Sequence, residues 1–336
     1  MRVLLTGGAG YIGSHTCVCL IQLGHQVVLY DNFSNSSRAV LNRILEITQE
    51  PIAFIQGDVR DTKLLTDTLK SYDIDAVINF AGYKAVGDSV IRPNDYYANN
   101  VQSAISLLSA METQGIKMLV FSSSATVYGE PHYLPIDEGH STNALSPYGR
   151  TKLHIEEMLR DIANADQGSS IVCLRYFNPV GAHVTGLIGE NPKGVPNNLM
   201  PYVAQVAGGI RSELSVFGND YSTSDGTGVR DYLHVMDLAE GHAAALNFLS
   251  ENVGWHAVNL GTGKGYSVLE LVSAFEVVSG RKIPLKIMPR RAGDVPACYA
   301  DTQKAMELFK WEAKRTLEDM CASAWQFQQR SEWKDK

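Results

Sequence analysis

Residues 2–13 read Arg-Val-Leu-Leu-Thr-Gly-Gly-Ala-Gly-Tyr-Ile-Gly, and this stretch decides the fold. It opens with an apolar run at 3–5 that does not alternate with polar residues, which is typical of a strand buried on both faces. A helical spacing of apolar residues then begins at Ile12 and ends at Gly24. The glycines between strand and helix are Gly7, Gly8, Gly10 and Gly13. Glycines at this place let the backbone approach a pyrophosphate, whose charge the N–H groups of the helix's first turn can bind, so we predict a dinucleotide-binding turn.

An acidic residue follows where such a turn needs one. Residues 26–30 form a second predicted strand, and Asp31 lies at its end. A carboxylate there accepts hydrogen bonds from an adenosine ribose and repels a 2′-phosphate, which favours NAD over NADP. The alternative is a glycine-rich turn that binds no ligand, and it explains neither the helix nor the acid.

Strands and helices continue to alternate up to residue 175. Further strands are predicted at 52–56, 76–80, 118–122 and 171–175, and helices at about 38–49, 61–70, 94–114 and 147–165. This alternation predicts an α/β fold with a Rossmann-type, doubly wound parallel sheet. The loops that follow the strands should meet at one edge of the sheet, where ligands bind.

The pattern changes in the second half of the chain. Residues 176–198 are rich in glycine, proline and asparagine and are expected to form a long functional loop. Short strands and helices follow, and we expect a smaller α/β domain at 176–336 that caps the first domain at 1–175, with residues 232–260 returning to the first domain. Residues 330–336 are charged and are expected to fray.

Composition excludes several classes of protein. The chain has 336 residues and a net charge of -7, and it shows no basic stripe that would bind nucleic acid. It contains no run of eighteen apolar residues, so no membrane segment is expected, and its early first strand leaves no room for a signal peptide. Its five cysteines are scattered without CxxC spacing, so we expect neither disulfides nor a metal site, and we expect a cytoplasmic protein.

A second motif carries chemistry. Tyr148 and Lys152 lie four residues apart in the helix predicted from 147, so they share one face of it. A phenol with its ordinary pKa of about 10 is a poor base, but a nearby ammonium, or the positive ring of bound NAD, favours the phenolate. Three serines at 122–124 end the preceding strand, and Ser124 is the best placed to pass a proton between Tyr148 and a substrate hydroxyl. Together they predict hydride transfer, in which a base takes a hydroxyl proton as the carbon gives hydride to NAD. The alternative, a solvated helix face, fits the Tyr–Lys pair alone.

These motifs resemble those of the extended short-chain dehydrogenase/reductase family, and within it the nucleotide-sugar 4-epimerases. The resemblance extends over essentially the whole chain and rests on TGGAGYIGSH at 6–15, FAGYKAVGDS at 80–89, SSSATVYG at 122–129, SPYGRTK at 146–152, LRYFNPVGAH at 174–183, PNNLMPYVAQVA at 196–207 and RRAGDVPA at 290–297. It implies a tightly bound NAD that is not consumed, and a nucleotide-sugar-binding domain at 176–336. It also implies interconversion of UDP-glucose and UDP-galactose: Tyr148 takes the O4 proton, NAD takes hydride from C4, and the 4-keto sugar turns over before hydride returns.

The resemblance also implies two sets of site residues. Those expected to line NAD are Gly7, Gly10, Tyr11, Ile12, Gly13, Asp31, Asn32, Asp58, Val59, Phe80, Ala81, Gly82, Lys84, Asn99, Ser122, Tyr148, Lys152, Tyr176 and Phe177. Those expected to bind the nucleotide sugar are Lys84, Ser124, Tyr148, Asn178, Asn198, Leu199, Phe217, Arg230, Arg291, Asp294 and Cys298.

The side chains of the second set suit a nucleotide sugar. A guanidinium such as Arg230 or Arg291 binds the paired oxygens of a diphosphate, Asn178 and Asn198 could bond sugar hydroxyls, and Phe217 could stack on uracil. Without the resemblance, a surface charge would be the favoured explanation of either arginine and core packing that of Phe217, while loop capping would explain the two asparagines equally well.

Cys298 departs from the pattern of the narrow-specificity bacterial members, which carry a tyrosine at this position. A thiol is far smaller than a phenol, so we predict that UDP-N-acetylglucosamine and UDP-N-acetylgalactosamine are also accepted. The alternative is that Cys298 only packs and Tyr299 fills the space.

Other functions and assemblies stay open. Related dehydratases and decarboxylases carry an acid after the strand-end hydroxyls, where this chain has Ala125 and Thr126. A net NAD-dependent oxidoreductase and a non-catalytic NAD-sensing protein are further alternatives. The family also implies a homodimer built from the helices at 94–114 and 147–165, whose apolar residues could instead face the sheet.

Overall fold

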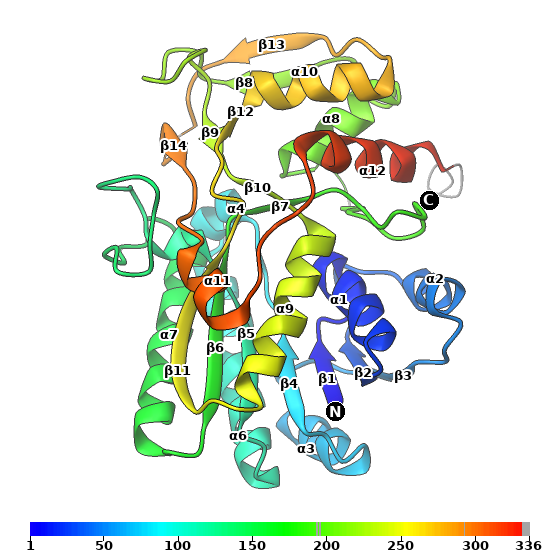
Figure 1. Ribbon diagram of the computed structural model, residues 1–336, viewed down its shortest axis with the longest axis vertical. Coiled ribbons are helices and arrows are strands. Elements are labelled where there is room, and N and C mark those ends of the chain that lie inside the picture. Colours follow the sequence, from blue (N-terminus) through cyan, green and yellow to red (C-terminus); the bar gives the residue numbers. More distant parts are fainter. Residues whose placement is uncertain (193, 195, 292, 331–336) are drawn as a thin grey trace.

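The computed structural model describes residues 1–192, 194, 196–291 and 293–330, so the expected fraying at 331–336 lies outside the described residues. A seven-stranded parallel sheet forms its centre, in the order β11-β6-β5-β4-β1-β2-β3 (Figure 1). The strands are β1 (Arg2–Thr6), β2 (Gln26–Asp31), β3 (Ala53–Gln56), β4 (Ala76–Asn79), β5 (Met118–Ser124), β6 (Ser170–Tyr176) and β11 (Gly254–Leu260). The predicted doubly wound parallel sheet is confirmed.

Helices cover both faces of the sheet, because its strands are apolar on both sides. Val3 and Leu5 pack with α1 (Tyr11–Gln22), α2 (Ala39–Thr48) and α9 (Val235–Leu249), whereas Leu4, which points the other way, packs with the opposite layer. That layer contains α3 (Thr62–Ser71), α6 (Gln102–Gln114) and α7 (Pro147–Ala165). The short helices α4 (Val86–Ile91) and α5 (Pro93–Tyr96) precede α6.

Two predicted elements differ in the structure. The helix predicted at 94–114 is divided, because a π-helical turn at Tyr97–Val101 separates α5 from α6. That turn carries Asn100, whose side chain holds the loop after β4 and also donates to Thr151 of α7 (3.1 Å). The expected loop 176–198 contains a strand, β7 (Asn178–Val180), which pairs in parallel with β10 (Tyr232–His234).

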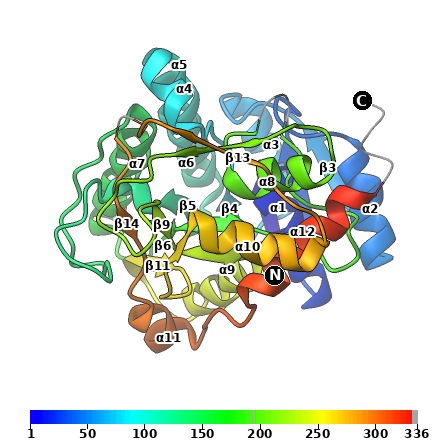
Figure 2. The same cartoon turned by 90° about the horizontal axis from the view of Figure 1, so that it is seen from above.

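The smaller part of the molecule lies over the carboxyl ends of the sheet strands (Figures 1 and 2). Its helices are α8 (Leu199–Ala207), α10 (Val268–Ser279) and α12 (Leu317–Gln329), which share an apolar core. Its strands are β8 (Leu214–Phe217) with β13 (Leu285–Met288), and β9 (Val229–Arg230) between β12 (Tyr266–Ser267) and β14 (Ala297–Cys298). Helix α11 (Gln303–Phe309) returns to the core beside α9.

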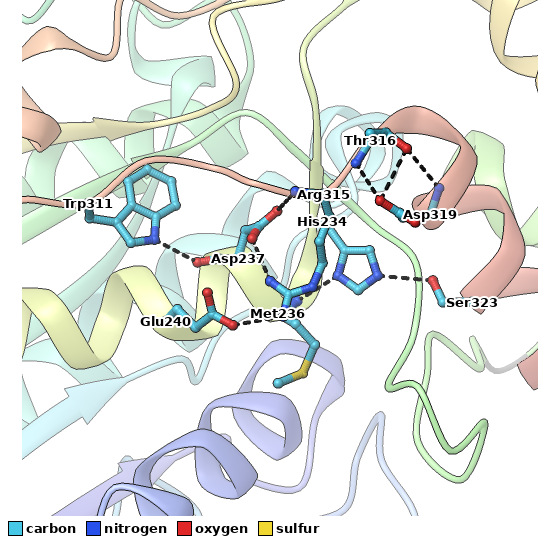
Figure 3. Close-up of polar contacts among 9 residues, drawn as sticks. All are labelled: His234, Met236, Asp237, Glu240, Trp311, Arg315, Thr316, Asp319 and Ser323. Carbon is cyan, nitrogen blue, oxygen red and sulfur yellow. Dashed lines mark hydrogen bonds and ion pairs between the residues drawn. The ribbon is translucent and has the colours of Figure 1, made fainter.

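A buried polar cluster ties α9 to the segment that leads into α12 (Figure 3). The buried carboxylate of Asp237 accepts from the backbone N–H (3.0 Å) and the guanidinium of Arg315, which also donates to Glu240 (2.8 Å). His234 contacts the hydroxyl of Ser323 in α12 (3.0 Å). Because β11 and α9 both belong to the core around the sheet, we propose a division into 1–175 with 232–260, and the remainder of 176–336.

Candidate active site

The glycine-rich turn between β1 and α1 has no room for side chains. Gly7 has a φ of 67°, and a Cβ there would lie 2.8 Å from the amide nitrogen of Ala81. A Cβ on Gly13 would lie 2.6 Å from the carbonyl oxygen of Gly7. Gly10 precedes α1, and no side chain caps that helix. The N–H groups of its first turn are therefore available to an anion, which fits the pyrophosphate of NAD.

Asp31 also supports this turn. Its carboxylate accepts from the N–H of Ala9 (3.1 Å), the N–H of Phe33 (2.8 Å) and the hydroxyl of Ser36 (2.9 Å). A carboxylate offers about four acceptor sites, so capacity remains for a ribose hydroxyl. The sequence predicted the ribose contact but not this second, structural use of Asp31.

Asp58 lies close to Asn32, as expected for two residues at one end of a cofactor. The Asn32 amide donates to Asp58 at 3.2 Å. Hydrogen bonds from Arg60 lower the pKa of Asp58 to about 2, so it is a carboxylate at neutral pH. Val59 is buried beside it. Because this carboxylate is negative, the part of the site around Asn32 and Asp58 suits a neutral adenosine ribose better than a 2′-phosphate.

The loop after β4 runs past the glycine turn. It carries Phe80, Ala81, Gly82 and Lys84, all expected to line NAD, and Gly7 backs directly onto Phe80 and Ala81. The side chain of Asn100 fixes this loop by accepting from the N–H of Tyr83 (2.8 Å) and donating to its carbonyl (3.0 Å). Asn99, also expected at the cofactor, donates to Asn100 (3.0 Å).

Tyr11 and Ile12 begin α1, immediately after the turn. The Tyr11 hydroxyl donates to the carbonyl of Gly181 (2.7 Å), so it joins α1 to the segment that follows β7. Ile12 is half-buried and packs against the core that the sheet shares with α1, α2 and α9.

The carboxyl end of β5 brings together the residues expected to carry the chemistry. They are Ser122 and Ser124 of β5 and Tyr148 and Lys152 of α7. The Lys152 ammonium donates to the carbonyl of Ser122 (2.6 Å) and lies 6.0 Å from the centre of the Tyr148 ring. Helix α7 is held at its start by Ser146, whose hydroxyl accepts from the N–H of Gly149 (3.1 Å). Because Tyr148 and Lys152 follow that cap directly, their positions are set by the beginning of the helix.

Thr126 orients the hydroxyl of Ser124. In the sequence it was noted only because it stands where related enzymes have an acid. The Ser124 oxygen accepts from both the N–H (3.2 Å) and the hydroxyl (3.0 Å) of Thr126. These two bonds leave the Ser124 proton free to be donated. The Tyr148 phenol is the acceptor that we expect for this proton, since Ser124 acts to lower the Tyr148 pKa.

Burial dominates the ionisation of the pair. It raises the pKa of Tyr148 to about 12, although Ser124 opposes the rise. It lowers the pKa of Lys152 to about 8, against the charges of Glu156 and Cys173. Burial of the phenol therefore opposes its ionisation, and the combined effect of the ammonium and the NAD ring on the phenolate stays a prediction.

A buried ion pair lies beside Lys152 on α7 and was not predicted. The guanidinium of Arg175 in β6 donates to the carboxylate of Glu156 in α7 (2.6 Å) and to the hydroxyl of Tyr128 (3.0 Å). Ser123 also donates to Glu156. Glu156 is one helical turn after Lys152, and that spacing was the signal available in the sequence.

Tyr176, at the end of β6, connects the sheet to α9. Its hydroxyl bonds to Nε2 of the buried His242. His242 Nδ1 contacts the carbonyl of Leu238 (2.8 Å), so Nδ1 carries the proton and Nε2 accepts from Tyr176. Phe80 packs on the same imidazole, with 4.8 Å between the ring centres.

The residues expected to bind the sugar form separate groups. Arg230 and Cys298 pair across β9 and β14, and Asp294 lies 3.8 Å from Arg230. Cys298 also packs with Phe177 in a small apolar cluster.

Arg291 stacks on Phe217 instead of standing free, with its guanidinium 3.7 Å from the ring centre. One face of that ring is therefore covered, and the stacking expected on uracil is left to the other face.

Three expected residues lie around the segment between β7 and α8. Asn178 is exposed at the start of β7, and Asn198 and Leu199 stand at the start of α8. Asn198 and Lys84 both donate to Glu190, a residue that the sequence did not indicate.

Some features are absent from the described part of the chain. Within it, no helix is long and apolar enough to cross a membrane, and no group of three or more His, Cys, Asp or Glu side chains is arranged to hold a metal ion.

Residues 3–261 of this chain match the sequence pattern of the NAD dependent epimerase/dehydratase family. The chain belongs to the NAD dependent epimerase/dehydratase family. This family member is 56% identical to a UDP-glucose 4-epimerase of Bacillus subtilis over 98% of this chain and 97% of the relative. Among solved structures it resembles the enzyme of Stenotrophomonas maltophila with bound NAD and formylated UDP-arabinopyranose (TM-score 0.96, 51% identity, 98% of each chain). It equally resembles that of Bifidobacterium longum in complex with NAD+ and UDP (TM-score 0.96, 50% identity, 99% of each chain).

Proposed function

We propose that this epimerase/dehydratase family member interconverts UDP-glucose and UDP-galactose at C4, with an NAD that stays bound and is not consumed. The observation that carries this proposal is the buried Tyr148 phenol beside the Lys152 ammonium, which the carbonyl of Ser122 holds at the sheet edge that also carries the glycine turn. Its relatives named UDP-glucose 4-epimerase support the choice of substrate.

Bound NAD supplies a hydride acceptor and donor, which allows C4 to be oxidised and then rebuilt. Tyr148 takes the proton from O4, directly or through Ser124, and later returns it. Lys152, held by the carbonyl of Ser122, contributes the positive charge that favours the phenolate. Thr126 donates to the Ser124 oxygen, which leaves the Ser124 proton for transfer.

Inversion also requires that the hexose turn while the nucleotide stays in place. Arg230, Arg291 and Asn198 would hold the diphosphate, because guanidinium and amide groups bind its oxygens directionally. No acid follows the strand-end hydroxyls, where Ala125 and Thr126 stand, so elimination chemistry has no obvious proton donor there.

A single assay tests this function. Purified protein is incubated with UDP-galactose without added nicotinamide cofactor, and the products are resolved by chromatography. We expect UDP-glucose to form with no build-up of NADH. NADH in proportion to consumed substrate would instead indicate a net oxidoreductase, and a product that has lost water a dehydratase. No change in the sugar, even after NAD is added, would overturn the proposal.

We further propose that N-acetylated UDP-hexosamines are substrates. Cys298 lies opposite Arg230 and packs with Phe177, whereas the ring of Tyr299 lies next to Gly265 (3.1 Å from a Cβ built there). Tyr299 follows the end of β14, and its place beside Gly265 supports the interpretation that its ring does not fill the space beside Cys298.

Replacing Cys298 by Tyr should abolish turnover of UDP-N-acetylgalactosamine and spare UDP-galactose. The measurement is kcat/KM for both sugars, with Cys298→Ser as the size-matched control that keeps both activities. Loss of both activities in the tyrosine variant, or of neither, would refute the idea.

We also propose a homodimer formed through α6 and α7. Leu107, Ile155 and Leu159 are buried beneath these helices against the sheet. Ile105 and Ile162 point outward, with exposed fractions of 49% and 36%, and offer an apolar surface to a second copy.

A further inference from the structure

Glu190 joins the two parts of the molecule at the site. It lies between β7 and α8, and its side chain is only 9% exposed. Oε1 accepts from the Lys84 ammonium (2.7 Å) and from the Asn198 amide (2.6 Å). Lys84 belongs to the loop after β4, which lies beside the glycine turn, whereas Asn198 immediately precedes α8 of the smaller part. One carboxylate oxygen therefore holds a residue expected at NAD and a residue expected at the sugar diphosphate.

The second oxygen of Glu190 is the less expected feature. Oε2 is buried and has no hydrogen-bond partner among the described residues. Glu190 also lines a small cavity with Gly181 and Met200. Gly181 accepts from Tyr11 at the start of α1, and the negative charge of Glu190 contributes to the raised pKa of Tyr11. A buried carboxylate with one oxygen unpaired is unfavourable for stability, so packing alone does not explain an acid at this position.

We propose that Glu190 is a positioning residue for the reaction, which holds Lys84 and Asn198 in the orientation that the two ligands require. This inference rests on the proposed function. Lysine has a long, flexible stem, and half of the Lys84 side chain is exposed, so without a partner its ammonium would sample many positions. Fixing it before the ligand arrives avoids that entropy cost on binding. The bond to Asn198 leaves its carbonyl oxygen and second N–H for a ligand.

Substitutions of Glu190 can show whether its negative charge or the length of its side chain matters for the reaction. Glu190→Gln keeps an oxygen that accepts from both partners but loses the charge. Glu190→Asp keeps the charge but is one methylene shorter. If Glu190 acts by positioning, the Asp and Ala variants should lose about tenfold in kcat/KM for UDP-galactose, mainly through KM, whereas Gln should stay within about threefold of wild type. A Gln variant as impaired as Ala would overturn the proposal.

A double-mutant cycle shows whether Glu190 acts through Lys84. We expect Glu190→Ala to cost clearly less in a Lys84→Ala background than in the wild type, because one of the two groups that it positions is already absent. If Glu190→Ala fails to fold by thermal melting, Glu190→Asp takes its place in the cycle. Glu213→Ala is the matched control, since Glu213 pairs with Lys286 (3.4 Å) on the surface, and it should leave kcat/KM unchanged.

The outcomes separate the two proposals. A wild-type protein that does not convert UDP-galactose would overturn the proposed function and this inference with it. An active wild type whose Glu190 and Lys84 losses multiply independently, or whose Glu190→Ala variant keeps full kcat/KM, would overturn the inference alone.

Discussion

Tyr148 shows what single side chains contribute to the site. Its phenol is buried, which raises its pKa to about 12, so the free protein holds it as a neutral hydroxyl at pH 7. Two neighbours favour its ionised form: Ser124 acts to lower its pKa, and the Lys152 ammonium lies 6.0 Å from the centre of its ring. A positive nicotinamide ring would add to the same effect, so proton removal and hydride transfer are electrostatically coupled.

Replacing Tyr148 by Phe should therefore reduce kcat for UDP-galactose by about 10²–10⁴-fold, the usual contribution of a positioned acid–base group. NAD should still be bound, because the glycine turn and Asp31 are unaffected, and NAD released on denaturation measures this. A Phe variant that keeps more than a tenth of wild-type kcat would exclude Tyr148 as the base.

At the scale of elements, the turn between β1 and α1 is as constrained as any part of the molecule. A Cβ on Gly13 would lie 2.6 Å from the Gly7 carbonyl and 2.8 Å from the Gly8 Cα, and backbone atoms cannot move aside as a side chain can. Gly13→Ala should destabilise the protein by about 1–3 kcal/mol, as overpacking does, and lower its NAD content. Urea unfolding and released NAD are the measurements. Gly87→Ala is the control, because nothing lies within 4 Å of a Cβ at that position; equal effects of the two substitutions would contradict the argument.

The packing of α1 against α9 contains three buried histidines that make the fold sensitive to acid. Burial lowers the pKa of His15 to about 3, of His234 to about 3 and of His242 to about 4. Below the ordinary histidine pKa of 6.5, the unfolded chain binds protons that the folded chain does not, so stability falls as pH falls from 6.5 towards 4. Each histidine contributes up to about 1.4 kcal/mol per pH unit.

Urea unfolding at pH 7, 6 and 5 measures this loss. Glutamine at position 242 can still accept from Tyr176. His242→Gln should therefore reduce the loss of unfolding free energy between pH 7 and pH 5 by the contribution of one histidine. The same substitution at His154, which is exposed, should not. A free energy of unfolding that stays constant from pH 7 to pH 5 would show that these histidines do not control acid stability.

For the whole molecule, the proposed dimer gives a simple prediction. Light scattering after size exclusion should give twice the chain mass of 36.8 kDa. Ile105→Glu should shift the protein toward the monomer, because it places a charge on the outward face of α6. Val277→Glu on α10, where the side chain is 82% exposed, should leave the mass unchanged. Elution of the wild type at the monomer mass would count against the dimer.

Features that depend on local spacing could be predicted from the order of the residues. The turn at Gly7–Gly13, the strand-end Asp31 and the shared helix face of Tyr148 and Lys152 are all visible within a few residues, because the periods of strands and helices fix which neighbours meet. The parallel sheet followed from the same alternation of elements.

The tertiary structure alone decided the contacts between distant segments. Glu190 meets Lys84 across 106 positions of the chain, and Tyr176 meets His242 across 66. It also showed that burial, rather than the Lys152 ammonium, dominates the Tyr148 pKa. Local periodicity does not contain these facts, because a side chain's partners and its exposure to water depend on how separate elements pack, and desolvation follows from that packing.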